Sequence, residues 1–396
     1  MSIPGVNIQF ANGNLGGVQA IEDGVCGLLC SATATSSFEL GKAYLLTSLE
    51  DLTDLGFNAS TNADAYKAVK DFYTEAPTGT KLWIYGVEKK VTIDELVSKE
   101  NNYAKALVES ANGEIKILFV SVTDDSDYSP AIANGLDGKV YTAITNAQAL
   151  AEDLTSSLYA PMLVVLPARH YTGNATELTD LTTMTNNRVS VVLGDTKKDS
   201  DDAAIGLFVG RLASLPVQRS VARVKNGAIK ADTMYIKSTE VDKMNIVAIH
   251  DKGFITPRTF VGMTGYYWSD DMTCTKASDD YSMIQRRRTI DKAYRIAYKT
   301  LVEELSDENP VNDNGEISAP MVKAIETKLE SAILNDMGVA GNLGNDPTDA
   351  NDLGVRCHIP EGQNIVATSR VKVILSIKPF GYAKYIDVEL GYMSNN

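Results

Sequence analysis

The stretch PMLVVLP, residues 161–167, is a short apolar run closed at both ends by proline. Such runs are typical of strands that are buried on both faces. Four similar runs occur at residues 24–33, 81–87, 115–122 and 188–194. Amphipathic segments lie between them, and we expect helices at residues 62–76, 93–110, 143–158, 176–185 and 203–215. This alternation predicts an α/β fold, with a parallel-type sheet domain and helices on both of its faces.

The chain changes character near residue 255, where Gly-rich and aromatic sequence leads into the longest helical pattern, residues 278–305. We expect the stripe of apolar side chains on that helix to face a second core; it consists of Ile290, Tyr294, Ala297, Leu301 and Leu305. The predicted parts are therefore an N-terminal extended arm (1–20), the α/β domain (21–255), a C-terminal α+β domain (256–380) and a C-terminal strand arm (381–396).

Composition limits the class of protein. The chain has 396 residues and a formal net charge of −14, so its overall field repels nucleic acid and anionic membranes. No apolar run approaches the roughly 20 residues that cross a bilayer, and the N-terminus lacks the features of a cleaved export signal. Its four cysteines, Cys26, Cys30, Cys274 and Cys357, have no metal or redox spacing. We expect them to be reduced and structural.

An alternating α/β domain also suggests an enzyme. The sequence has neither a G-x-G-x-x-G motif after a strand nor a Walker phosphate loop. His170 follows the strand that ends near Pro167, and Asp195 follows the next strand after Gly194. Ligands bind at this edge of parallel sheets. An enzyme or ligand-binding protein that uses the loops after Pro167 and Gly194 is thus the alternative reading, although a polar pair of loops explains the same residues.

Strand-like sequence runs almost to the C-terminus. Apolar residues alternate over Arg370–Lys378, Pro379 and Gly381 interrupt them, and Tyr385–Tyr392 resumes an extended pattern. The second of these strands needs a partner, and that partner need not lie in the same chain.

The segment QRRRTIDK carries the local basic cluster Arg286, Arg287, Arg288 and Lys292. Intrachain salt bridges and docking to an acidic partner surface are both open explanations.

Several segments together resemble the sheath proteins of contractile phage tails and related injection systems. The matching features are PGVNIQF and EDGVCGLLCSAT near the start, the segment from LLTSLEDL to TKLWIYGV, the arginine-bearing helix SDDYSMIQRRRTIDKAYRIAYKTL, and the ending SIKPFGYAKYIDVELGY. The resemblance covers nearly the whole chain. It implies a structural subunit without catalytic residues, cofactor or metal site.

The resemblance also implies partners. The subunit would form a helical homopolymer around a tail tube protein, with baseplate and tail terminator proteins at its ends. It would be assembled in the bacterial cytoplasm into a virion tail or injection-system particle. Both arms would add strands to neighbouring subunits, through Ile3, Val6 and Ile8 at one end and Tyr385, Ile386, Val388 and Leu390 at the other. The cations Arg286, Arg287, Arg288 and Lys292 would face the tube.

Overall fold

The computed structural model describes residues 22–243 and 246–391, and its largest element is a six-stranded sheet in the order β2-β3-β1-β4-β7-β9. All neighbouring pairs are parallel except β2 with β3, which is antiparallel. The strands are β1 (Cys26–Ser31), β2 (Ala43–Leu46), β3 (Leu82–Val87), β4 (Ile117–Ser121), β7 (Leu163–Pro167) and β9 (Val189–Val192).

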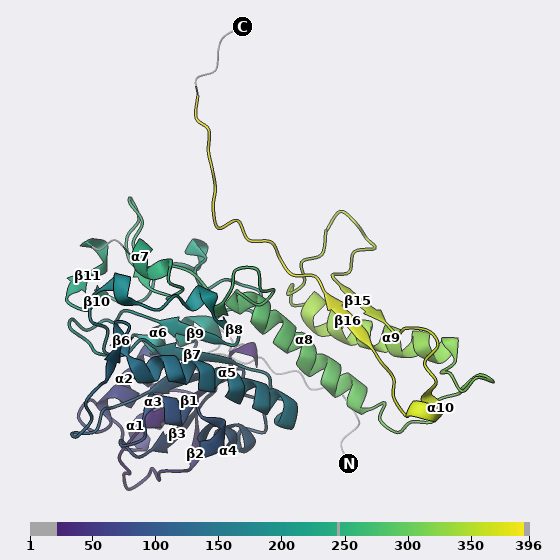
Figure 1. Ribbon diagram of the computed structural model, residues 1–396, viewed down its shortest axis with the longest axis horizontal. Helices are drawn as coiled ribbons and strands as arrows, with labels where there is room; N and C mark the ends of the chain where they lie inside the picture. The colour runs from purple at the N-terminus through teal and green to yellow at the C-terminus, as the bar shows by residue number, and fades with distance from the viewer. Residues whose placement is uncertain (1–21, 244–245, 392–396) are drawn as a thin grey trace, which may run out of the picture.

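The apolar runs in the sequence become the central strands. Every residue of β1, β4, β7 and β9 is buried, because helices cover both faces of the sheet (Figure 1). The cysteine thiols of β1 are part of this core, and burial raises the pKa of Cys26 and of Cys30 to about 12. All four cysteines are buried and free, so the thiols are unreactive packing groups.

Two groups of helices pack on the sheet. α2 (Ala63–Glu75) and α6 (Ile205–Ala213) lie against each other and against β4, while α4 (Tyr103–Ser110) contacts β1 and β3 and α5 (Gly138–Leu158) contacts β7 and β9. The contact between α2 and α6 is unusually close. A Cβ atom at Gly210 would lie 2.3 Å from the Phe72 carbonyl oxygen, so only glycine fits there.

The remaining elements before residue 284 are short turns and two-residue strands. The helices and turns are η1 (Glu22–Gly24), α1 (Leu49–Asp54), α3 (Ile93–Leu96), η2 (Lys99–Asn101), η3 (Ala175–Glu177), η4 (Leu181–Thr183), η5 (Val224–Asn226), η6 (Val241–Lys243) and α7 (Val247–His250). The strands are β5 (Ile132–Ala133), β6 (Leu136–Asp137), β8 (Thr185–Asn186), β10 (Tyr235–Ile236), β11 (Thr239–Glu240), β12 (Pro257–Arg258), β13 (Tyr267–Trp268) and β14 (Cys274–Thr275).

A long helix, α8 (Ile284–Val302), joins this body to a smaller C-terminal lobe, which extends to one side in Figure 1. The lobe consists of α9 (Ala319–Ile333), the π-helical turn η7 (Leu334–Gly338), β15 (Val355–His358), α10 (Ile365–Thr368) and β16 (Ile374–Ile377). β15 and β16 form an antiparallel hairpin that packs on α8 and α9. None of the helices within the described ranges is long and apolar enough to cross a membrane.

The predicted helices at residues 93–110 and 176–185 are wrong in part. The first is divided into α3, η2 and α4, because Asn102 adopts a left-handed conformation at φ 59°. The second contains only the turns η3 and η4, where the side chains of Asn174 and Asp180 accept backbone hydrogen bonds and stabilise turns in place of a continuous helix. The predicted boundary at residues 255/256 stays a prediction; the main core includes Trp268, Cys274 and Ile284.

The predicted core-facing stripe of α8 is wrong for four of its five residues, since only Leu301 packs on a described core cluster, that of Ile317, Ile325 and Ile359. None of its five residues is buried, and Leu305 is 73% exposed. The buried face instead carries Arg287, Arg288 and Asp291. This face crosses the amino edge of the sheet, where Arg295 donates to the carbonyls of Gly113, Ile115 and Pro161 at 2.6–2.7 Å. Carbonyls that precede parallel strands need hydrogen-bond donors, and this need explains the polar buried face.

Candidate functional site

The C-terminal segment after β16 is attached to the body at a few points. Pro379 lies against Gly344 of the C-terminal lobe. On the body, the Tyr382 hydroxyl donates to the Gln218 carbonyl, and Lys384 pairs with Asp270 at 2.5 Å and with Asp271 at 3.2 Å. A hollow of about 1020 Å³ separates residues 380–386 from the body. The segment is therefore held by individual polar contacts and not by a continuous packed face.

The segment leaves the molecule directly after Lys384. Tyr385, Ile386, Val388 and Leu390 are 79–94% exposed, and no residue of 385–391 belongs to a strand. Figure 1 shows this stretch running away from the body. Ile386, Val388 and Leu390 would share one face if the stretch became a strand. The second strand predicted from the sequence thus has no ladder partner within the described part of its own chain.

The hairpin of β15 and β16 has one closed edge and one open edge. On the outer side of β15, Cys357 N–H donates to Glu330 Oε1 and Ile359 N–H to Glu326 Oε1, both at 2.8 Å. Both glutamates belong to α9. β16 pairs only with β15 in the described residues, and it lies on the α8 side of the hairpin (Figure 1). A strand added to this hairpin would therefore enter beside β16 and lie over α8.

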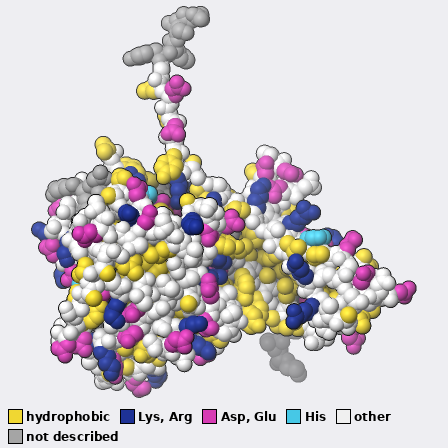
Figure 2. Space-filling model, viewed as in Figure 1, with side chains coloured by type: hydrophobic (Ala, Val, Ile, Leu, Met, Phe, Trp, Pro, Cys, Tyr) yellow, Lys and Arg dark blue, Asp and Glu magenta, His cyan; other side chains and the backbone are white. Residues whose placement is uncertain are grey.

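The surface over α8 suits such an addition because it is apolar. Figure 2 shows a band of hydrophobic side chains in the hollow between the body and the C-terminal lobe. Tyr298 is 40% exposed and stacks on Tyr159 with 4.1 Å between the ring centroids. Val302 and Leu305 are 42% and 73% exposed. Tyr298 and Val302, together with Leu305 from the predicted core stripe, thus form an uncovered face.

The basic cluster of α8 is engaged within the subunit. Arg287 pairs with Asp291 at 2.7 Å, and Lys292 pairs with Asp23 and Asp336 at 2.8 Å each. Arg288 donates to the Leu215 carbonyl and is 5% exposed. Intrachain contacts, the explanation that the sequence left open, account for these three cations, whereas we expected them to project from the subunit. Arg286 and Arg288 have no described ion pair, and of these two only Arg286 is partly exposed.

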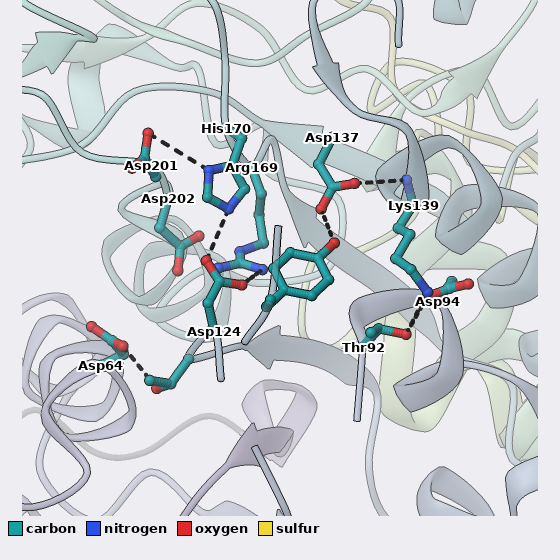
Figure 3. Close-up of polar contacts among 12 residues, drawn as sticks. Asp64, Thr92, Asp94, Asp124, Asp137, Lys139, Arg169, His170, Asp201 and Asp202 are labelled. Carbon is teal, nitrogen blue, oxygen red and sulfur yellow. Dashed lines mark hydrogen bonds and ion pairs between the residues drawn. The ribbon is translucent and has the colours of Figure 1, made fainter. Parts of the chain in front are cut away.

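The loops at the carboxyl edge of the sheet form an ion-pair network (Figure 3). Asp124 accepts hydrogen bonds from Arg169 and His170 at 2.9 Å, and His170 also lies 3.8 Å from Asp201. Burial alone would raise the pKa of Asp124, but the bonds from His170 and Arg169 hold it below its usual range. Asp124 and His170 are 46 residues apart in the sequence, so no local pattern indicated their pairing.

The loops after Pro167 and Gly194 border little free space. Asp195 is bonded to Lys67 at 2.8 Å and makes no contact with His170. The cavity that touches the loops after Pro167 and Gly194 has a volume of about 10 Å³, which holds about one water molecule. Over residues 22–243 and 246–391, no cluster of His, Cys, Asp and Glu could hold a metal ion. The predicted N-terminal arm residues Ile3, Val6 and Ile8 lie outside the described residues.

Comparison with known proteins relates these surfaces to a family. Residues 3–272 match a family described as "DUF2586, N-terminal domain", and residues 280–396 match "DUF2586, C-terminal domain". No curated protein matches the chain.

Several solved structures have the same fold. The helical sheath of the anti-feeding prophage in its contracted state is 18% identical, with a TM-score of 0.64 and 99% of both chains covered. The sheath complex of the extracellular contractile injection system PVC is 15% identical, with a TM-score of 0.62 over 99% of this chain and 98% of the other. The sheath tail protein of Desulfitobacterium hafniense is 12% identical, with a TM-score of 0.52 over 89% and 93%.

Proposed function

Because the chain belongs to the DUF2586 family and has the fold of contractile sheath proteins, we propose that it is a contractile sheath subunit. In this proposal many copies form a helical homopolymer around a tail tube, assembled in the cytoplasm as part of a virion tail or injection-system particle. Contraction of the polymer drives the tube through the target envelope. Baseplate proteins contact one end of the polymer and terminator proteins contact the other.

The observation that carries the proposal is the unpartnered C-terminal stretch. Four large apolar side chains within six residues, 79–94% exposed, are costly to leave in water. Strand addition to a second copy would cover them and satisfy the backbone N–H and C=O groups at the same time. A contact in which one copy donates an arm and the next receives it is head-to-tail, and it generates a helical filament where the rotation between copies does not close into a ring.

In the proposal, the edge of β16 accepts the C-terminal stretch of a neighbouring copy. The open edge of β16 has backbone N–H and C=O groups that can bond to an added strand. The apolar face of α8 beneath it can pack against Ile386, Val388 and Leu390 of that strand. Residues 1–20, with Ile3, Val6 and Ile8, are proposed as a second arm of the same kind. Each backbone hydrogen bond contributes about 0.5–1.5 kcal/mol net, so several bonds link two copies firmly.

The arm attachments allow subunits to move without separating. The body is held together by buried strands, whereas the apolar side chains after Lys384 are 79–94% exposed. In the proposal, subunits rearrange as rigid bodies while the arms bend near Lys384 and keep neighbours connected. A better packed contracted lattice supplies the energy, and no nucleotide takes part.

The tube contact is proposed on the exposed part of the basic cluster. Arg286 and Arg288 have no described intrachain ion pair; Arg288 is 5% exposed, whereas Arg286 and Lys292 are partly exposed. Arg287 and Arg288 would support the helix that presents them. Charge pairs with acidic groups of a tube would hold register and still separate into water at modest cost.

Electron microscopy of the purified chain tests this proposal. We expect the wild-type chain to form regular tubes or helical filaments, and Val388→Asp to remain as single folded subunits. The matched control is Glu389→Lys, which changes charge on the opposite face of the same stretch and should still assemble. Compact monomers of the wild-type chain at high concentration, or normal tubes from Val388→Asp, would contradict it.

A further inference from the structure

A second feature lies where α8 crosses the amino edge of the sheet. A cavity of about 330 Å³ is enclosed there by the first described residues, the loop before β4, and one side of α8. Its volume is within the range of small-molecule sites. The cations Lys116, Arg288 and Arg295 line it. The partners of these three side chains determine what the cavity can bind.

None of the three cations has a carboxylate partner in the described chain. Arg295 donates only to carbonyl oxygens, of Gly113, Ile115 and Pro161. Arg288 donates to the carbonyls of Leu215 at 3.1 Å and Asp23 at 3.4 Å, and Lys116 Nζ donates to the Glu22 carbonyl at 3.0 Å. In addition, the Nε of Arg295 and one terminal nitrogen of Arg288 are buried without any acceptor.

The carboxylates around the cavity are mostly committed elsewhere. Asp23 and Asp336 pair with Lys292, and Asp291 pairs with Arg188 and Arg287. Glu114 bonds to Lys81 and to the Trp83 indole. Glu22 lies at the rim and is exposed. The 21 residues that precede it contain no Asp or Glu, so that part of the sequence brings no counter-charge.

An excess of buried positive charge is costly. Burial lowers the pKa of Arg288 and of Arg295, and burial together with the charge of Arg295 lowers the pKa of Lys116. Burial thus disfavours the charged forms of these side chains, while the charge of Asp23 acts in the opposite direction on all three. An isolated buried charge costs several kcal/mol unless it is paired. Three cations around one cavity, none bonded to a carboxylate, point to a site for a small anion.

We propose that this cavity binds a small free oxyanion of the phosphate class, with Lys116 and Arg295 as its hydrogen-bond donors and Arg288 as a supporting charge. Lys116 Nζ uses one of its three N–H groups on the Glu22 carbonyl, which leaves two for a ligand. A dianion fits better than a single carboxylate, because one negative charge would leave two of the three cations uncompensated. The bound anion would stabilise the junction between the sheet and α8.

The test is thermal unfolding of the full-length chain in inorganic phosphate and in sodium chloride of equal ionic strength. Sedimentation first verifies that the sample is not assembled. We expect a rise in Tm of about 2–4 °C at roughly ten times Kd, growing with the logarithm of the phosphate concentration above Kd, with phosphate and not with chloride. Acetate should give a smaller rise. Lys116→Met should abolish the response, and the exposed control Lys89→Met should keep it.

The test relies on Lys116→Met because a substitution of Arg295 can cause misfolding. Arg295→Met removes donors from three carbonyls and can destabilise the fold, whereas Lys116→Met removes one bond to a carbonyl at the rim. Equal responses to phosphate and chloride in the wild-type chain would overturn the proposal. A phosphate response in Lys116→Met equal to that of the wild type would also overturn it. Neither outcome depends on whether the chain polymerises, so this inference and the proposed function fail separately.

Discussion

Lys384 Nζ lies 3.2 Å from Oδ1 of Asp271, a carboxylate with 1% side-chain exposure whose second oxygen has no described partner. Lys384 also bonds Asp270 at 2.5 Å, and Asp270 accepts from His250 at 3.2 Å. This cluster is the last attachment of the C-terminal stretch before it leaves the body. It gives the stretch a defined point from which to bend.

Replacement of Lys384 by Met should destabilise the unassembled subunit by about 1–3 kcal/mol, because two poorly solvated carboxylates lose their shared cation. Urea denaturation measures this difference. The matched control is Lys378→Met, whose partner Asp352 forms a solvent-exposed pair. It should cost less than about 1 kcal/mol. Equal effects of the two substitutions would mean that the cluster at Lys384 does not fix the stretch.

Asp271 also predicts a pH dependence. Burial raises its pKa to about 6, above the value of about 3.9 in the unfolded chain. The folded state therefore holds this proton more tightly, and the stability from Asp271 is greatest below pH 4 and falls as the pH rises to 6. His250, whose pKa the bond to Asp270 raises, stays protonated in this window.

The variant Asp271→Asn removes this titration. As the pH rises from 4 to 6, the stability of the variant relative to wild type should increase by about 1–3 kcal/mol, because only the wild type loses stability over this range. Urea unfolding of both chains across that range measures the change. A constant difference across the window would show that Asp271 titrates normally in the folded chain.

Removing the two glutamates that close the edge of β15 should destabilise the C-terminal lobe. Glu326→Ala with Glu330→Ala leaves the N–H groups of Cys357 and Ile359 without acceptors. We expect the double variant to lose about 1–3 kcal/mol of stability and to form irregular oligomers through the exposed edge. Sedimentation velocity detects these species. Glu303→Ala with Glu304→Ala, which removes only exposed pairs with Lys328, should behave as wild type.

A charge introduced at the centre of the sheet should cause a severe folding defect. Val165 lies in β7 between β4 and β9 and is fully buried. Val165→Asp places an unpaired charge there and should cost several kcal/mol, enough to abolish soluble expression. Val261→Asp makes the same change at an exposed position and should leave expression and Tm unchanged. Normal melting of Val165→Asp would refute the central placement of β7.

Sequence alone determined the sheet domain. Continuous apolar runs such as residues 161–167 have no solvent-facing side, so they require cover on both faces, and a parallel sheet between helices provides it. The capping pattern at Ser48 likewise specified the start of α1. The alternating C-terminal residues indicated a strand in need of a partner. These features are local, and local side-chain chemistry specifies them.

Only the tertiary structure decided the orientation of α8. Its apolar stripe predicted a core contact, yet the helix crosses the amino edge of the sheet, where carbonyl oxygens such as those of Gly113 and Pro161 require donors. That edge is assembled from loops far apart in the sequence, so no periodicity reveals it. The same long-range assembly pairs Asp124 with His170, closes β15 with Glu326 and Glu330, and encloses the cavity at Lys116 and Arg295. Periodicity reports which face of a helix is apolar, whereas the groups that surround the helix decide which face is buried.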